Sequence, residues 1–278
     1  MPVLKRILFP VDFSEQCVGA ARYVEAIAGR FEAEIMMLHV VSDGEQVLAR
    51  ELLPARQAQL EQFLTEELKY FTIHKSCVMG DPAAGIVEAA QSWKADLVMM
   101  PSHGVGFFRR LLLGSVTAKV LHDLDSPVWT GVHAEKAPPL EKITCSKVLC
   151  AVDLSDRSSS VLEWAASLAR EYDAKLGIVH AIPSVEASAA AQFLDQEYVA
   201  DLAVAARSAI DGLQLAVGTD ATVFVDGGEI SKVVHCTTKE FGADLLVIGR
   251  HSRFGLAGHL WHSAYGIITE SSCPVISI

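Results

Sequence analysis

The sequence lacks any apolar run long enough to cross a membrane. Its hydrophobic stretches are short, and 95–101 is already interrupted by Asp96, whereas a spanning helix needs about 20 apolar residues. The first residues also lack the charged segment, the long apolar stretch and the small-residue cleavage site of a secretory signal. We therefore expect no membrane partner and a cytoplasmic location.

Motifs for metal binding and thiol chemistry are missing as well. None of the six cysteines forms a Cys-x-x-Cys pair, and such cysteines in a cytosolic chain are mostly small buried hydrophobic residues. His235, His251, His259 and His262 gather late in the chain, but no carboxylate or thiol accompanies them at a known ligand spacing. We predict no metal site.

Charge and catalytic motifs exclude two further classes of function. The chain carries 23 basic and 34 acidic residues, a formal net charge of −11, which repels the phosphate backbone of nucleic acids. It has no His-Glu-x-x-His motif, no nucleophile elbow with a Ser-His-Asp set and no convincing carboxylate pair. We predict a protein that is not an enzyme and that has no nucleic-acid partner.

What the sequence does contain is an internal repeat. Four anchors recur in the same order, the first two at an offset of 141 residues and the last two at 147–148. They are ILFPVDFS at 7–14 with VLCAVDLS at 148–155, MLHV at 37–40 with IVHA at 178–181, ADLVM at 95–99 with ADLLV at 243–247, and SPV at 126–128 with CPV at 273–275. The longer later offset predicts an insertion in the second copy around 184–212.

The repeat predicts two domains of similar size and a short linker. The stretch 133–141 is polar and contains the pair Pro138-Pro139, a composition typical of linkers. We assign residues 1–134 to the first domain, 135–145 to the linker and 146–278 to the second domain.

Each copy is predicted to alternate strands with helices. Short β-branched runs favour strands, and apolar residues at helical spacing favour helices, with Ser14 as an N-cap. The predicted strands of the first copy are 7–11, 34–41, 71–78, 97–100 and 128–132, and the predicted helices are 14–30, 48–70, 83–93 and 115–124. This order implies an α/β fold, with an open five-stranded parallel sheet and flanking helices in each copy. Ligands of such sheets bind at the carboxyl ends of the strands, near the point where the strand order reverses.

The segment 101–117 (PSHGVGFFRRLLLGSVT) has the composition of an anion-binding loop. It follows an all-apolar strand, contains a glycine turn, and reaches Gly114-Ser115 at the start of a helix. Helix N-termini leave amides unpaired, glycine allows close approach, and the hydroxyls of Ser115 and Thr117 could add donors. The alternative is that the glycines serve turns and that Ser115 only caps its helix. Spacing alone favours neither.

These anchors together resemble the universal stress protein family. The family pattern is Gly, two residues, Gly, nine residues and Gly-Ser/Thr, which Gly104, Gly114 and Ser115 match. The resemblance implies the adenine nucleotide alpha-hydrolase-like fold and an ATP site, alone or with Mg²⁺, with adenine near Asp12 and Val40. The implied nucleotide-binding residues are Pro10, Val11, Asp12, Val40, Met100, His103, Gly104, Gly114, Ser115, Val116 and Thr117.

Two departures from the family pattern bear on that site. Pro101 replaces the first glycine and removes a backbone N–H. In the second copy the pattern has Gly249, Ser252, His262 and Ser263, so only the first glycine and the last serine remain. We expect the second copy not to bind ATP in the usual manner of the family, and to serve as a scaffolding half or to bind something else.

Two repeated residues have alternative interpretations. Asp12 and Asp153 each follow a first strand, where an aspartate can contact a ligand or cap the next helix. We favour the ligand role for Asp12 and the capping role for Asp153. His39 and His180 lie within strands at equivalent points, which indicates near-core histidines bonded to the backbone rather than catalytic ones.

Taken together, the resemblance implies an ATP-binding regulatory or stress-response module with at most slow ATP hydrolysis. Its two domains would pair within the chain as a pseudo-dimer through their last strands, and two chains could pair further into a homodimer. The alternative is a nucleotide-free scaffold or interaction protein of the same fold.

Overall fold

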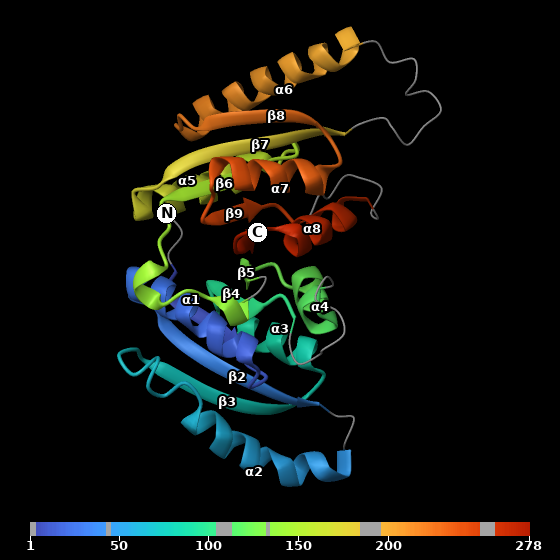
Figure 1. The fold of residues 1–278 in the computed structure, drawn as a ribbon. Coiled ribbons are helices and arrows are strands. Elements are labelled where there is room, and N and C mark those ends of the chain that lie inside the picture. The colour runs from blue at the N-terminus through green and yellow to red at the C-terminus, as the bar shows by residue number, and fades with distance from the viewer. Residues whose placement is uncertain (1–3, 43–45, 104–112, 132–133, 184–195, 251–258) are drawn as a thin grey trace. The chain divides into compact units, whose positions relative to one another are not determined.

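The computed structural model describes residues 4–42, 46–103, 113–131, 134–183, 196–250 and 259–278 (Figure 1). The chain divides into two compact units between Thr144 and Cys145. We call the part up to Thr144 the first unit and Cys145–Ile278 the second unit. Among the described helices, none combines the length and the hydrophobicity of a membrane span.

The first unit is a five-stranded parallel sheet in the order β3-β2-β1-β4-β5. Its elements are β1 Arg6–Pro10, α1 Glu15–Phe31, β2 Glu34–Ser42, α2 Gln46–Gln62, β3 Ile73–Gly80, α3 Pro82–Ser92, β4 Leu97–Pro101, α4 Ser115–Asp123 and β5 Val128–Gly131. Every predicted element of this copy is confirmed, and all but one lie within two residues of their predicted bounds. The second helix ends at Gln62, and turns take the place of its predicted last eight residues.

The second unit repeats this topology, with strand order β10-β9-β6-β7-β8. Its elements are β6 Lys147–Ala151, α5 Ser158–Tyr172, β7 Lys175–Pro183, α6 Gln196–Val217, β8 Thr222–Gly228, α7 Ile230–Phe241, β9 Leu245–Ile248, α8 His259–Glu270 and β10 Val275–Ser277. The strands are again all parallel. The helix α6 is longer than its counterpart α2, and it lies in the region of the predicted insertion.

The core of each unit lies on both faces of its sheet. All residues of β4 and of β9 are buried. Because consecutive strand residues point to opposite faces, such strands must be covered on both sides. The helices α3 and α4 pack together in the first unit, as α7 and α8 do in the second (Figure 1).

The repeated anchor at 95–99 and 243–247 contains an aspartate that binds the start of the first strand in each copy. Asp96 Oδ2 accepts hydrogen bonds from the backbone N–H groups of Lys5 (2.8 Å) and Arg6 (2.9 Å), at the beginning of β1. Asp244 Oδ2 does the same for the two residues at the beginning of β6, at 2.7 and 3.0 Å. The aspartate therefore ties the fourth strand of each copy to the first.

The segment predicted as a linker packs on the first unit. Ala134 and Ala137 are buried, and residues 134–136 form a 3-10 helix against α1. The Arg22 guanidinium on α1 donates to the carbonyl oxygens of Ala137 and Pro138. This part of the connection is thus anchored by specific contacts, although its composition is that of a loose linker.

The Asp96 clamp makes a stability prediction. Asp96→Ala removes two hydrogen bonds between a carboxylate and backbone amides, so the free energy of unfolding of the first unit should fall by about 1–3 kcal/mol. Urea denaturation followed by circular dichroism measures it. Asp125→Ala is the matched control, because Asp125 is exposed and has no hydrogen bond in the described part of the chain; its effect should stay within about 0.5 kcal/mol. Equal effects of the two changes would contradict the clamp.

Candidate functional site

The candidate site lies where the strand order of the first unit reverses, between β1 and β4. The two strands are neighbours, with Ile7 opposite Leu97, so their carboxyl ends emerge side by side. Pro10 ends β1, and the Val11 N–H donates to the Leu38 carbonyl of β2 at 2.8 Å. The structure therefore confirms that the residues after β1 and the residues after β4 come together at one edge of the sheet.

Hydrogen bonds hold the two ends of the connection from β4 to α4 together. The Gly114 N–H donates to the Ser102 carbonyl at 2.8 Å, and Ser102 N–H donates to the Gly131 carbonyl of β5 at 3.1 Å. The Thr117 hydroxyl donates to the Pro101 carbonyl at 3.2 Å and is buried. Thr117 thus uses its hydroxyl to hold α4 against β4. Gly104, with the rest of 104–112, lies outside the described residues.

The N-terminus of α4 has no side-chain cap. Its N-cap is Gly114, in an extended conformation, and Ser115 is the first helical residue, with an exposed side chain; Val116 follows half-buried. The alternative that Ser115 caps this helix is therefore wrong. A β-carbon on Gly114 would lie 3.3 Å from His103 Cα, which is tighter than ordinary contact, so glycine permits the close approach. His103 itself lies beside the strand end, with Nδ1 3.1 Å from the Ser102 hydroxyl.

Asp12 holds the turn that leads into α1. Its Oδ1 accepts from the Ser14 N–H at 3.0 Å and from the Cys17 thiol at 3.1 Å, and Ser14 is the N-cap of α1, as predicted. Asp12 therefore closes the turn before α1, whereas the helix itself is capped by Ser14. A contact from Asp12 to a ligand stays a prediction.

The end of β2 carries a histidine with a structural role. His39 Nδ1 lies 2.7 Å from the Val11 carbonyl oxygen, and since that oxygen can only accept, Nδ1 carries the proton. Burial lowers the pKa of His39, although the bond to Val11 opposes the shift. Val40 follows and packs on α3, where a β-carbon on Gly85 would lie 3.1 Å from its side chain. The structure confirms a backbone-bonded histidine and places Val40 against α3.

A cluster of rings beside this site was not predicted. The Phe13 ring lies 4.5 Å from the His39 ring and 5.2 Å, edge-on, from the Phe63 ring, and the Arg56 guanidinium lies 5.9 Å from the centre of the Phe13 ring. Phe13 has a φ of 63°, a left-handed conformation that costs a non-glycine residue about 1 kcal/mol or more. Leu154 has the same conformation in the second unit, with a φ of 60°. The only signal in the sequence is that both residues follow the repeated aspartate.

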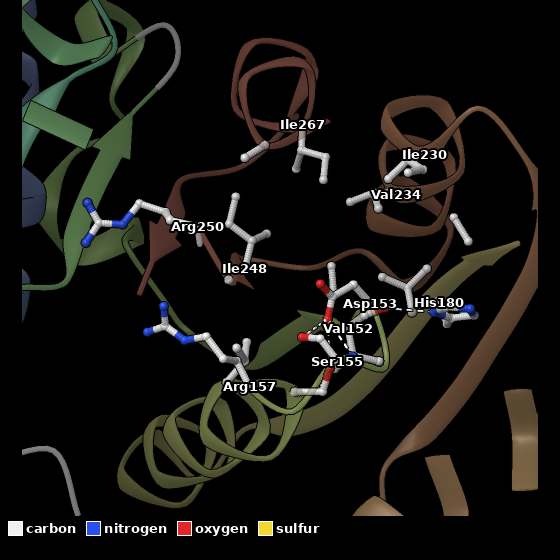
Figure 2. A pocket seen from close by; sticks show the side chains of 17 residues that line it. Val152, Asp153, Ser155, Arg157, His180, Ile230, Val234, Ile248, Arg250 and Ile267 are labelled. Atoms are coloured by element: carbon white, nitrogen blue, oxygen red, sulfur yellow. Dashed lines mark hydrogen bonds between the residues drawn. The ribbon is translucent and has the colours of Figure 1, made fainter. Parts of the chain in front are cut away.

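A pocket of about 240 Å³ lies at the equivalent edge of the second unit (Figure 2). Ala151, Val152 and Asp153 in its wall stand where the first copy has Pro10, Val11 and Asp12. Figure 2 shows apolar side chains around the space opposite Asp153 and Ser155. The lining residues are Ala151, Val152, Asp153, Ser155, Arg157, Ser158, Val161, Val179, His180, Ala181, Ile230, Val234, Ile248, Gly249, Arg250, Ala264 and Ile267.

Asp153 is engaged by its neighbours in this pocket. Its Oδ1 accepts from the Ser155 N–H (3.0 Å), the Ser155 hydroxyl (2.6 Å) and the Ser158 hydroxyl (3.0 Å). Burial alone would raise the pKa of Asp153, but these hydrogen bonds outweigh it and lower the pKa. His180 Nδ1 lies 2.8 Å from the Val152 carbonyl, as His39 does in the first unit. The bonds to Asp153 hold the turn before α5, whereas the N-cap of that helix is Arg157 without a side-chain cap bond, so the predicted capping role of Asp153 is wrong.

Metal ligands do not gather in the described part of either unit. No group of three or more His, Cys, Asp or Glu residues able to hold a metal ion occurs there. His251 and the side chains of His259 and His262 lie outside the described residues.

The fold and the two equivalent sheet edges define an α/β protein with a duplicated domain. Residues 4–130 and 145–278 both match the universal stress protein family, so the chain belongs to this family and is a tandem two-domain member.

Similar proteins agree with this assignment. Universal stress protein MJ0577 of Methanocaldococcus jannaschii is 30% identical over 150 residues, covering 45% of this chain and 92% of that protein. Universal stress protein MJ0531 of the same organism is 35% identical over 136 residues, covering 45% of this chain and 79% of that protein. A universal stress protein structure from Archaeoglobus fulgidus has a TM-score of 0.74 at 22% identity and covers 100% of this chain and 97% of its own, which shows the shared fold.

Thiol reactivity tests the local chemistry of the site. Burial and the Asp12 charge raise the pKa of Cys17 to about 12, so its thiol should not act as a nucleophile near neutral pH. Cys236, in contrast, is exposed. Burial also raises the pKa of the other cysteines, which are Cys77, Cys145, Cys150 and Cys273.

An aromatic disulfide reagent at pH 7.5 should therefore label one thiol rapidly in the native protein. Cys236→Ser should abolish that phase and Cys17→Ser should leave it; a fast phase that survives Cys236→Ser would contradict this account.

Proposed function

We propose that this universal stress protein binds an adenine nucleotide in its first domain and acts as a regulatory module of the stress response. ATP, alone or with Mg²⁺, would place adenine near Asp12 and Val40 and its phosphates over the start of α4. The observation that carries the proposal is the glycine-capped N-terminus of α4, held at the end of β4. Amides and a positive helix end suit a polyphosphate even on a chain of net charge −11.

Pro101 is compatible with this site. It is the last residue of β4, opposite Gly131 of β5, and its carbonyl oxygen accepts the Thr117 hydroxyl bond that positions α4. Proline at position 101 therefore lacks a backbone N–H, but its carbonyl oxygen still helps to hold the proposed phosphate-binding helix α4 in place. Phosphate contacts would come from the amides of Ser115 and Val116, because the Gly114 N–H already donates to the Ser102 carbonyl.

The second domain is proposed not to bind ATP in the family manner. His262 takes the position of Gly114 in the sequence pattern, so the second copy lacks the glycine that would let the backbone approach phosphate. The pocket of about 240 Å³ in this unit is also below the range of about 300–1,000 Å³ usual for cofactors and drug-sized ligands. Asp153, in addition, already accepts three hydrogen bonds.

Regulation rather than turnover is the proposed outcome of binding. The thiol nearest the site, Cys17, is held protonated, and the nearby His39 is bonded to the backbone. ATP hydrolysis would be slow and incidental. We further propose a cytoplasmic location, and pairing of the domains through their last strands stays a prediction. The alternative function is a nucleotide-free scaffold of the same fold.

Calorimetry with ATP and Mg²⁺ tests the proposal. Wild-type protein should release heat at one site per chain and gain thermal stability. Gly114→Val should weaken binding at least tenfold, because its β-carbon would press on the chain at His103 and its bulk would cover the amides. Gly227→Val is the matched control, since a β-carbon there meets nothing within 4 Å, and it should bind as the wild type does.

Two outcomes would count against the proposal. If ATP gives neither heat nor a change in melting temperature, the scaffold alternative is favoured. If Gly114→Val binds ATP as tightly as the wild type, the nucleotide does not lie on the N-terminus of α4.

A further inference from the structure

The helix α6 of the second unit has two apolar faces. Its inner face, with Ala206 and Ile210 fully or nearly fully buried, packs on β8. Its outer face carries Val204, which is 68% exposed, and Leu215, which is 86% exposed. A helix with one apolar face packs on one neighbour, whereas a helix that is apolar on opposite sides is expected to be covered on both.

The two exposed apolar side chains belong to one stripe. Residues 204 and 215 are eleven positions apart, so at about 100° per residue their side chains point in directions that differ by only about 20°. They are separated by about 16 Å along the helix axis. Ala200, Ser208 and Asp211 lie on the same side and are exposed. The stripe is therefore a narrow surface with large apolar residues near both ends and small or polar residues at its centre.

The described side chains of the equivalent helix in the first unit form no such surface. The exposed residues of α2 whose side chains are described are Pro54, Ala55, Ala58, Gln59, Glu61 and Gln62, with no large apolar side chain among them. The two helices have the same position in the same fold. The outer stripe is thus not required by the fold, and it belongs to the longer helix of the second copy.

We infer that the outer stripe of α6 is the interface between two copies of this chain, which pack their α6 helices antiparallel about a two-fold axis. An axis between Ala209 and Ile210 would bring Val204 of each copy against Leu215 of the other. The same axis brings Arg207 of each copy next to Asp211 of the other, and both side chains are exposed. The stripe is therefore self-complementary in charge as well as in shape, as an isologous contact requires.

The charges favour a second copy over other occupants. Arg207 and Asp211 have opposite signs and lie at similar distances on either side of the proposed axis, so the antiparallel arrangement pairs them twice. A parallel arrangement would instead place each charge next to its own kind. The chain as a whole has a net charge of −11, so two copies repel unless the contact surface is itself nearly neutral. The outer stripe satisfies that condition.

One pair of helices makes a small interface. It should bury less than the about 800 Å² per partner of a standard interface, so the dimer should be weak, with a Kd on the order of 10–100 μM. Sedimentation equilibrium of the full chain should show a mass near 30.0 kDa at about 1 μM that rises toward twice this value at about 300 μM.

Charged residues at the two ends of the stripe should remove self-association. Leu215→Glu and Val204→Glu should keep the chain monomeric at all concentrations. Tyr70→Glu is the matched control, since Tyr70 is 83% exposed and belongs to the first unit, not to α6. It should associate as the wild type does. Unchanged circular dichroism and melting temperature show that each variant folds.

A charge exchange distinguishes this arrangement from a general apolar contact. Arg207→Asp or Asp211→Arg alone should weaken association about tenfold, because each leaves like charges facing each other. The double variant Arg207→Asp with Asp211→Arg should restore association to within about threefold of the wild type. A monomeric wild type at 300 μM, a dimer that persists in Leu215→Glu, or a double variant no better than the single ones would overturn the inference.

Discussion

The proposed ligand chemistry of this protein depends on one short connection. The Gly114 amide and the Thr117 hydroxyl bind the carbonyl groups of Ser102 and Pro101, and these two bonds hold the N-terminus of α4 at the end of β4. Without them the amides of the first turn would have no fixed position relative to the sheet. With them, a positive helix end faces the edge where a parallel sheet of this topology presents its ligand site.

Duplication has kept the scaffold and changed the site. Both units retain the aspartate that clamps the first strand and the histidine bonded to the carbonyl after that strand. Both also have a left-handed residue directly after the aspartate that follows the first strand, which is Asp12 in one unit and Asp153 in the other. These are interactions within the protein: the clamping aspartate holds the amino edge of the sheet, and the other two features lie at its carboxyl edge. At the proposed phosphate position the copies differ in sequence, with Gly114 in the first and His262 in the second. The exposed faces of the equivalent helices differ too, since α6 exposes Val204 and Leu215, whereas the described part of α2 exposes no large apolar side chain. This divergence agrees with the two proposals, which assign the nucleotide to the first copy and the contact with a second chain to the second copy.

The sequence predicted most of the fold, because strand and helix periodicities and the repeat are local signals. The predicted second helix ran to residue 70, past the observed end of α2 at Gln62, for a physical reason. Leu60, Leu64 and Leu68 are all buried at helical spacing, yet Leu64 has a φ of 53° and the chain turns there. The site was predicted in outline, since strand ends at the reversal of strand order can be located from the order of elements. Which groups are already engaged could not be predicted, because the Thr117 bond and the Phe13 ring cluster join residues far apart in the sequence.

Hydrogen exchange followed by mass spectrometry tests the central claim most directly, because it locates bound phosphate on the backbone. Addition of ATP with Mg²⁺ should slow exchange of the amides of Ser115 and Val116, and of the segment 10–12 beside them. The equivalent segment 151–153 of the second unit should exchange at an unchanged rate. Unchanged exchange at Ser115 and Val116 under saturating ATP, or protection confined to the second unit, would contradict the account.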